Sequence, residues 1–153
     1  MNIAIVGTGS VGSALGRGWS AKGHMVTFAS RDPEGEKATT LREQMPATVS
    51  VRGTREATST ASTIVLAIPY GAVPETLSQM GDLSGKVIVD CTNPIAPGLR
   101  SLVDSETSGA QEIAALVPEA KVIKAFNTIG AESMDNPILT ADQPPCSFAV
   151  TIC

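Results

Sequence analysis

The feature that most constrains the fold lies in residues 1–24, which read as a strand, a glycine-rich turn and a helix. Residues 2–6 (NIAIV) contain four apolar side chains and do not alternate, which is typical of a strand buried on both faces of a parallel sheet. The turn that follows has the spacing GTGSVG at residues 7–12, and residues 13–21 are predicted to form a helix. This order indicates the first unit of a parallel α/β fold.

Each glycine of the turn has its own predicted role. Gly7 permits the tight turn out of the strand, Gly9 lets a phosphate approach the backbone, and Gly12 lets the helix lie close to the sheet. The helix start directs free N–H groups and the positive end of its dipole toward that phosphate. Because another strand follows at residues 25–29, the context favours a dinucleotide-binding unit over a glycine turn without a ligand.

Length and composition favour a single domain over residues 1–153. Aromatic residues make up 3% of the chain and the net charge is −4, so neither a nucleic acid nor an anionic membrane is an expected partner. No apolar run approaches the roughly 20 residues of a membrane-spanning helix. The chain begins directly with a core strand and leaves no room for a signal segment, so we expect a cytoplasmic protein.

Neither the cysteines nor the histidine predicts a catalytic or metal site. Cys91, Cys146 and Cys153 are odd in number and lack C-x-x-C spacing, so we expect reduced thiols, with Cys91 a small apolar filler after a strand. His24 is the sole histidine and lies in a Lys-Gly-His turn, where a polar turn residue is favoured over a catalyst. We therefore assign no catalytic acid or base and no metal ligand.

The end of the strand at residues 25–29 predicts which dinucleotide binds. That position faces the adenosine ribose, where a carboxylate suits NAD, and donors with positive charge suit the 2′-phosphate of NADP. The sequence offers Ser30 and Arg31, and a guanidinium can hold a phosphate bidentately. Asp32 competes as a ribose ligand, but Asp-Pro-Glu is typical of a helix start with Asp32 as N-cap. NADP is favoured, and a solvated loop charge is the alternative for Arg31.

The chain then continues to alternate strands and helices. Apolar runs predict strands at residues 48–51, 63–68, 86–90 and 121–126, and helices are expected at 32–45, 53–60, 72–80 and 109–116. Residues 97–108 are polar and loop-like. The alternation predicts an α/β fold with a doubly wound parallel sheet in the order 3-2-1-4-5-6, the NAD(P)-binding Rossmann arrangement.

The last twenty residues fit this pattern less well. A helical turn is expected at residues 130–134, a loop at 135–145 and an apolar strand at 147–152. No helix follows that strand, although parallel sheets bury both faces. We therefore expect missing residues or a partner chain to cover it.

Two further strand ends are predicted to face the cofactor. The strand at 63–68 lies beside the first strand, across the point where strand order reverses, so Ile68 and Pro69 should form a wall of the crevice. Asn93 follows the strand at 86–90, where its amide is placed to meet the nicotinamide or the second substrate. Asn93-Pro94 is equally typical of a turn opening, so both interpretations stay open.

Five segments together carry a family resemblance: residues 1–24, ASRDPE (29–34), AIPY (67–70), DCTNP (90–94) and KAFNTIG (124–130). At these relative positions they resemble the deazaflavin-dependent NADP oxidoreductases, which comprise the NADPH:coenzyme F-420 reductases and their relatives. The likeness covers residues 1–135. The same segments are similar to the cytosolic NADPH domain of membrane metalloreductases, which pass hydride to a flavin.

The resemblance implies a set of site residues. Thr8, Ser30 and Arg31 match residues for the NADP 2′-phosphate, and a family lysine that helps this phosphate is displaced to Lys37 by Gly35-Glu36. The other matches are the pyrophosphate loop (Gly7, Thr8, Gly9, Ser10, Val11 and Gly12), the nicotinamide-side wall (Ile68 and Pro69) and the deazaflavin side (Asn127, Thr128 and Ile129). Ala67, Asn93 and Pro94 are further candidate cofactor-binding residues. Family chains continue into helices that complete the second-substrate pocket and a homodimer.

The expected reaction is direct hydride transfer between NADPH and coenzyme F-420, a small-molecule acceptor. The cofactors supply the chemistry, and the protein supplies orientation and exclusion of water. The lack of an assignable Ser/His/Asp or Cys/His set agrees with this expectation. The alternatives are an NADPH-dependent flavin or metal reductase domain and a non-catalytic NADP-binding module.

Overall fold

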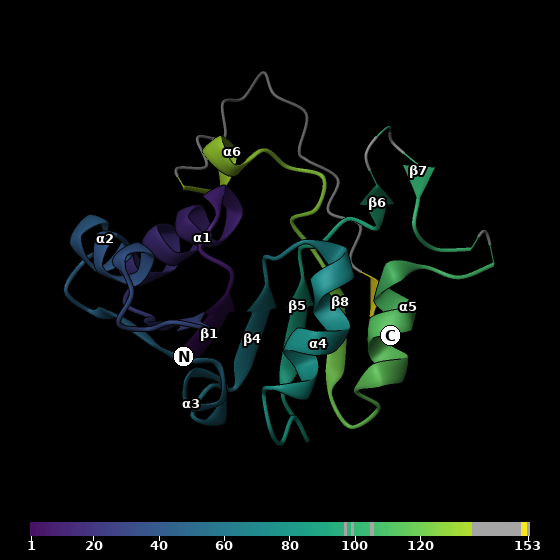
Figure 1. The fold of residues 1–153 in the computed structure, drawn as a ribbon, viewed down its shortest axis with the longest axis horizontal. Coiled ribbons are helices and arrows are strands. Elements are labelled where there is room, and N and C mark those ends of the chain that lie inside the picture. Colours follow the sequence, from purple (N-terminus) through teal and green to yellow (C-terminus); the bar gives the residue numbers. More distant parts are fainter. Residues whose placement is uncertain (97, 99, 105, 136–150, 153) are drawn as a thin grey trace.

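A twisted, mainly parallel sheet forms the centre of the computed structural model, which describes residues 1–96, 98, 100–104, 106–135 and 151–152 (Figure 1). Its strand order is β3-β2-β1-β4-β5-β8-β9. The parallel strands are β1 (Asn2–Val6), β2 (Met25–Ser30), β3 (Val49–Gly53), β4 (Thr63–Leu66), β5 (Val87–Asp90) and β8 (Lys121–Lys124). This confirms the predicted doubly wound order, with β8 as its sixth strand.

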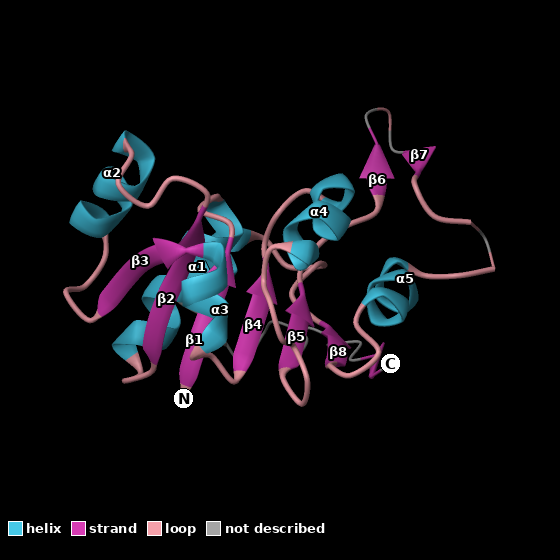
Figure 2. Ribbon diagram, turned by 60° about the horizontal axis from the view of Figure 1, so that its bottom comes forward, coloured by secondary structure: helices cyan, strands magenta, loops and turns pink. Residues whose placement is uncertain are grey.

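Helices cover both faces of the sheet, as Figure 2 shows. One face packs against α1 (Ser10–Ala21), α2 (Glu36–Gln44) and α6 (Ala131–Asp135), and the other against α3 (Thr54–Ser59), α4 (Val73–Ser78) and α5 (Gly109–Leu116). Ile3 and Ile5 of β1 belong to the first of these cores, whereas Ala4 and Val6 belong to the second. Successive strand residues point to opposite faces, so a central strand needs apolar side chains at every position.

The prediction that Asp32 caps a helix starting at Pro33 is wrong. Helix α2 begins at Glu36, and its N-cap is Gly35 in an extended conformation, with no side chain bonded to the helix start. Residues 32–35 form a turn instead, in which the Gly35 N–H donates to the Asp32 carbonyl oxygen at 3.4 Å. The propensity of Asp-Pro for a helix start is local, and the turn that carries the chain from β2 onto the sheet face overrides it.

Several other element limits also differ from expectation. Helix α1 starts at Ser10, three residues early, because Gly9 serves as its N-cap. Strands β4 and β8 stop two residues early, at Leu66 and Lys124. The predicted loop after β5 includes a small antiparallel hairpin, β6 (Ile95–Ala96) and β7 (Arg100–Ser101), which lies above the carboxyl end of the sheet in Figure 1.

The last part of the chain is described only in pieces. The predicted helical turn near 130–134 is confirmed as α6, which packs against α1. Strand β9 (Thr151–Ile152) pairs antiparallel with β8, so part of the predicted final strand is present. The expected loop at 136–145, residues 147–150, Cys146 and Cys153 lie outside the described residues.

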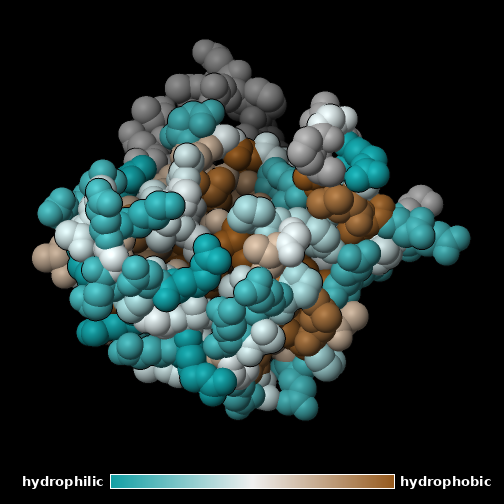
Figure 3. All heavy atoms as spheres, viewed as in Figure 1, coloured by the Kyte–Doolittle hydropathy of each residue, from teal (hydrophilic) through white to brown (hydrophobic). Residues whose placement is uncertain are grey.

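The surface differs between the two halves of the view in Figure 3. Apolar residues gather on the right-hand side, around α4 and α5, whereas the side around α2 and α3 is mostly hydrophilic. Of the large apolar side chains that are exposed, Ile95, Leu102 and Leu116 belong to the segment between β5 and β8. Within the described part of the chain, no helix combines the length and the apolar character needed to cross a membrane.

Candidate functional site

The glycine turn between β1 and α1 has a backbone geometry that only glycine can adopt at two of its positions. Gly7 adopts φ +119°, and a Cβ built on it would lie 2.1 Å from the carbonyl oxygen of Ala67. A Cβ on Gly12 would lie 2.1 Å from the carbonyl oxygen of Gly7. Any larger residue at either position overlaps backbone that cannot move aside, so both glycines are required for the turn and the close helix approach.

Gly9 differs from these two glycines because its surroundings are open. A Cβ on Gly9 would meet nothing within 4 Å, and its backbone is extended, with φ −77°. Packing within the chain therefore does not require a glycine there. The space above Gly9 opens into the adjacent cleft, where the missing side chain leaves the backbone accessible. This is the feature expected of a glycine selected for the close approach of a ligand.

Helix α1 presents an uncapped N-terminus at the same place. No side chain accepts a hydrogen bond from its first turn, and that turn holds no acidic residue. The first hydrogen bond of the helix runs from the Ser13 N–H to the Gly9 carbonyl oxygen at 2.9 Å. A 12-residue helix with free amides and no local negative charge is suited to an anion.

A cleft of about 600 Å³ extends from the glycine turn along the carboxyl ends of β2 and β4. It brings together nine of the predicted residues: Gly7, Thr8, Gly9, Ser30, Arg31, Lys37, Ala67, Ile68 and Pro69. Asp32, Glu36, Thr54, Glu75, Thr76 and Gln79 also line the cleft, and the sequence had not assigned them to it as ligands. Thr54 had one available signal, because it follows the carboxyl end of β3.

The segment after β2 places its charged side chains at the rim of this cleft. The Ser30 hydroxyl donates to the Asp32 carbonyl oxygen at 2.8 Å and accepts from the Asp32 N–H at 3.1 Å. The hydroxyl is therefore engaged in shaping the turn. Arg31 is exposed, and within the described residues its guanidinium forms no hydrogen bond or ion pair. Of these two side chains, Arg31 is therefore the one whose donor groups are available to bind an anion.

The other predicted residues do not line the cleft, and those of the loops after β5 and β8 lie farther along the carboxyl edge. The Asn93 side-chain amide donates to the Asn127 carbonyl oxygen at 3.1 Å, and the Asn127 amide donates to Asn93 Oδ1 at 3.3 Å. These bonds join the loops after β5 and β8. Pro94, Thr128 and Ile129 belong to the same two loops, while Ser10, Val11 and Gly12 lie in the first turn of α1.

The backbone turns sharply just before Asn127. Phe126 has φ +67°, the only non-glycine residue of the described chain in the left-handed region. Such a conformation costs of order 1–3 kcal/mol and persists only where the surroundings impose it. Here the Phe126 ring packs edge-to-face on Trp19 of α1, with ring centroids 6.0 Å apart. This packing directs the chain so that Asn127 reaches Asn93.

A buried ion pair fixes the base of these loops, and sequence reasoning missed it. The Asp90 side chain is fully buried, and its Oδ2 accepts from Lys124 Nζ at 2.8 Å. Its Oδ1 accepts from the Thr92 N–H at 2.9 Å and from the Thr92 hydroxyl at 2.7 Å. Lys124 also donates to the Thr92 carbonyl oxygen. Asp90 and Lys124 end two strands that pair in register, but they are 34 residues apart, so no local sequence pattern shows the pair.

Tyr70 forms a second link on this side of the sheet. Its hydroxyl donates to Glu112 Oε2 of α5 at 2.5 Å. Burial, followed by the hydrogen bond to Glu112, raises the pKa of Tyr70 above its ordinary value. A Cβ on Gly109, the first residue of α5, would lie 3.0 Å from the Tyr70 ring and 3.3 Å from Pro94. The start of α5 therefore packs closely against the residues that follow β4 and β5.

The described cysteine and the histidine occupy the positions that the sequence predicted. Cys91 is buried at the end of β5, where the sequence predicted a small apolar filler, and it is free in the part of the chain that the structure describes. Burial, and then the charge of Asp90, raises the pKa of the Cys91 thiol to about 12. His24 lies in the turn before β2, where its Nδ1 is 3.4 Å from the Met1 amino group. This turn precedes β2, so it is at the opposite edge of the sheet from the cleft.

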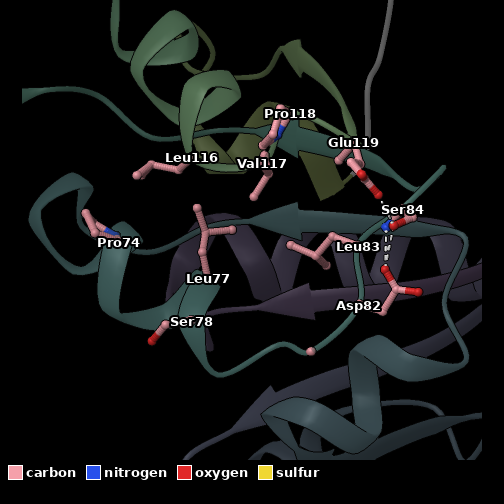
Figure 4. Close-up of a pocket in the computed structure, with 12 residues that line it drawn as sticks. Pro74, Leu77, Ser78, Asp82, Leu83, Ser84, Leu116, Val117, Pro118 and Glu119 are labelled. Carbon is pink, nitrogen blue, oxygen red and sulfur yellow. Dashed lines mark hydrogen bonds between the residues drawn. The ribbon is translucent and has the colours of Figure 1, made fainter.

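A second hollow lies at that opposite edge, between the end of α4 and the end of α5 (Figure 4). Leu77, Leu116 and Val117 point into it, and the loops that precede β5 and β8 form its rim. The Ser84 hydroxyl lies 2.6 Å from both Asp82 Oδ1 and Glu119 Oε2, and the Ser84 N–H donates to Asp82 Oδ1 at 2.9 Å. The hydrogen bonds from Ser84 hold the pKa of Asp82 below its ordinary value. None of the predicted site residues lines this hollow.

The parallel sheet, the crossover order and the glycine turn at the start of α1 define a Rossmann-type nucleotide-binding fold. A family model described as NADP oxidoreductase, coenzyme F420-dependent, matches residues 2–94. This match spans more than half of the chain, and the chain belongs to that family.

Individual relatives agree with the family. A candidate F420-dependent NADP-reductase from Arthrobacter sp. FB24 is 28% identical with a TM-score of 0.79, over 90% of this chain and 67% of that one. The Sinorhizobium meliloti protein SMa0349 is 29% identical with a TM-score of 0.75, over 88% of this chain and 65% of that one. Metalloreductase STEAP3 of Rattus norvegicus is 28% identical over 129 residues, 84% of this chain. The chain spans only 25% of the length of that rat protein.

Proposed function

We propose that this chain binds NADP(H) in the cleft at the carboxyl edge of its sheet and orients the nicotinamide for hydride transfer to a small acceptor. The observation that carries the proposal is the open backbone at Gly9, beside an uncapped helix start and within one cleft with Arg31. Bound NADPH supplies the hydride. The residues of this chain bind, orient and shield it.

The glycine turn fits the pyrophosphate of such a cofactor. Gly7 and Gly12 are fixed by packing inside the chain, so they set the shape of the turn whether or not a ligand binds. Gly9 is free of such packing and leaves room for phosphate oxygens to reach the first amides of α1. The charge of the bound anion is then balanced by the helix dipole rather than by a side chain.

The charges at the end of β2 favour NADP(H) over NAD(H). Arg31 provides a guanidinium without a partner among the described residues, and Lys37 lies in the same cleft. Asp32 also lines the cleft, and it does not cap α2, so it is available as a ribose ligand. A 2′-phosphate would pair with Arg31, and its repulsion from Asp32 is the opposing force. We place the phosphate on the arginine, in line with membership of an NADP oxidoreductase family.

Coenzyme F-420 is the acceptor that we favour, and the second candidate is a flavin, which can take up the hydride and pass its two electrons singly to a metal complex. The family description and the Arthrobacter relative support F-420, whereas the likeness to a metalloreductase supports the second candidate. The paired amides of Asn93 and Asn127 are proposed to face the acceptor side of the nicotinamide. Ile68 and Pro69 are proposed to form the wall that excludes water.

The cofactor assignment is tested with Arg31→Ala. We expect this variant to weaken NADPH binding more than NADH binding by about 1.5–3 kcal/mol, as for a lost charged hydrogen bond. Arg52→Ala is the matched control, because Arg52 is an exposed arginine on β3 that pairs with Glu56 at 3.6 Å and does not line the cleft. An equal loss of both nucleotides in Arg31→Ala would remove Arg31 from the phosphate site.

The acceptor is tested by mixing the chain with NADPH and either F-420, a flavin or a chelated ferric ion. The loss of absorbance of reduced nicotinamide reports turnover. Turnover with F-420 alone supports the favoured acceptor, and turnover with flavin or ferric ion alone supports the second candidate. Binding of NADPH without turnover in any mixture would contradict the proposal that this chain is an oxidoreductase by itself. The chain would then be a non-catalytic NADP-binding module or would act only together with a partner.

A further inference from the structure

The turn that carries Arg31 has few bonds to the rest of the molecule. Residues 31–34 leave the carboxyl end of β2 and lead into α2, beside β3 (Figure 2). Within the described residues, the local hydrogen bonds of this turn are to the adjacent residues Ser30 and Gly35. Beyond these neighbours, the described bonds to the turn come from a single side chain, Arg42 on the last turn of α2.

Arg42 bonds to the turn through its strongest contact. Its Nη2 donates to the Pro33 carbonyl oxygen at 2.7 Å, a distance at the short end of the usual range for charge-assisted hydrogen bonds between nitrogen and oxygen. The same nitrogen lies 3.4 Å from the carbonyl oxygen of Val51 on β3. Val51 is buried and lies in register with Phe28 of β2, so its contact with Arg42 fixes the guanidinium relative to the central sheet.

The ion pair of Arg42 with Glu34 does not explain the position of Arg42. Glu34 is 86% exposed, and its Oε1 is 3.4 Å from Arg42 Nη2. Exposed pairs of this kind contribute little, because water and salt screen them and two long side chains must be ordered. The contact that can hold the turn is therefore the bond to the Pro33 backbone, which does not depend on the charge of Glu34.

We propose that Arg42 is a positioning residue for nucleotide selectivity, which fixes the turn at residues 31–34 so that Arg31 faces the 2′-phosphate. This inference rests on the proposed NADP(H) site and adds a residue to it. Arg42 does not line the cleft and is not proposed to touch the nucleotide. It acts by reducing the ordering that the turn must undergo when the phosphate binds.

The predicted effect is specific to one nucleotide. NADPH and NADH share the pyrophosphate that binds at the glycine turn, but only NADPH has the 2′-phosphate that the turn receives. In a loosened turn, Arg31 and its neighbours must become ordered when NADPH binds, so the affinity for NADPH falls. The affinity for NADH changes little. Ordering a few backbone and side-chain groups corresponds to a change in affinity of about 3- to 10-fold.

The test measures dissociation constants for NADPH and NADH in the wild-type chain and in Arg42→Met, Arg42→Lys, Glu34→Gln and Arg52→Met. We expect Arg42→Met to weaken NADPH by about 3- to 10-fold and NADH by less than about 2-fold. Arg42→Lys should recover part of the selectivity that Arg42→Met loses, because its ammonium keeps the charge and can donate to the Pro33 carbonyl oxygen, although it lacks the planar guanidinium that fixes the donor in place. Glu34→Gln and Arg52→Met should retain the wild-type ratio.

Thermal unfolding of each variant keeps the test independent of folding. Should Arg42→Met unfold, the decision passes to Arg42→Lys, which keeps the charge and one bond. The inference is overturned if folded Arg42→Met keeps the full wild-type preference for NADPH, if Arg42→Lys keeps it in full where Arg42→Met does not fold, or if Glu34→Gln loses the preference as well. A wild-type chain without preference for NADPH would instead overturn the proposed cofactor, a result that the wild-type titration reveals by itself.

Discussion

The two halves of the carboxyl edge of the sheet are built in different ways. The half at β1 and β2 is made of backbone: two glycines fixed by packing, one open glycine and an uncapped helix start. The half at β5 and β8 is made of side-chain pairs: Asp90 with Lys124, Asn93 with Asn127, and Tyr70 with Glu112. The first half is an open cleft, whereas the second is tied together.

This difference suggests a division of labour. A dinucleotide can bind to exposed amides without displacing any bond of the protein, so the open half suits a ligand that is common to a whole class of proteins. The tied half fixes two loops against each other, which suits the positioning of a reacting ring against an acceptor. Within the open half, loss of Gly9 or Arg31 should therefore alter binding, whereas Gly7, which is fixed by packing, and the buried ion pair of the tied half should determine stability.

The largest effect expected is that of Gly7→Ala. A Cβ 2.1 Å from the Ala67 carbonyl oxygen, at φ +119°, forces the turn apart, and we expect a loss of at least about 4 kcal/mol in the free energy of unfolding. Gly9→Ala is the matched comparison. It should cost no more than about 1 kcal/mol, the penalty for alanine at a helix N-cap, while weakening NADPH at least about tenfold.

Urea unfolding and nucleotide titration of both glycine variants give the two quantities. The interpretation of Gly9 as a ligand-contact glycine would be wrong if Gly9→Ala bound NADPH as the wild-type chain does. The interpretation of Gly7 as a structural glycine would be wrong if Gly7→Ala were as stable as Gly9→Ala.

Lys124→Met should have the next largest effect. It leaves the fully buried Asp90 carboxylate without its cation, and breaking a buried pair in this way costs about 3–5 kcal/mol. Lys124→Met combined with Asp90→Asn should recover part of the loss, because no buried charge then remains. Urea denaturation of the single and double variants measures both values. A single variant within about 1 kcal/mol of the wild type would show that the pair does not hold the two loops.

The Cys91 thiol should make stability fall in alkaline solution. The folded protein holds the pKa of this thiol at about 12, whereas the thiol of the unfolded chain titrates near its ordinary pKa of 9.0. Above about pH 9 the unfolded state has lost a proton that the folded state keeps, so stability falls by up to about 1.4 kcal/mol per pH unit. Cys91→Ala should remove this part of the slope. Unfolding curves for both chains between neutral and alkaline pH test it, and identical slopes would contradict it.

Asn127→Ala should have the smallest effect on stability. The amide pair is exposed, and its loss should cost about 0.5–1.5 kcal/mol. Hydride transfer should slow while the dissociation constant of NADPH stays unchanged, because the pair lies outside the cleft. Single-turnover rates and nucleotide titrations separate these quantities. A weaker NADPH complex with an unchanged rate would place Asn127 in the cofactor site rather than on the acceptor side.

The contrast between the halves also accounts for what the sequence could reveal. The strand, turn and helix at residues 1–24 interact locally, so spacing alone located Gly7, Gly9 and Gly12, and the alternation of elements predicted the sheet order. The pairing of Asp90 with Lys124 depends on two strands 34 residues apart, and no local pattern contains it. The prediction of where α2 starts was wrong for a related reason, because the tertiary placement of the turn overrides the propensity of Asp32-Pro33 to start a helix.

The hairpin and the end of the chain follow the same rule. Strands β6 and β7 are two residues each and carry no periodic signal, so neither was predicted, and β7 falls within the predicted loop at residues 97–108. Helix α5, by contrast, was predicted with its correct limits, and the structure shows that Ser108 and Gln111 form a capping box at its start. Local chemistry is readable in this chain, whereas long-range side-chain pairing is not.

The most direct test of the central claim is calorimetric titration of the folded wild-type chain with NADPH and, separately, with NADH. Binding of NADPH with clear heat and at least about tenfold tighter than NADH is the predicted result, since one guanidinium contact to the 2′-phosphate distinguishes the two ligands. The account is contradicted if a chain shown to be folded gives no heat with NADPH, or if it binds the two nucleotides equally.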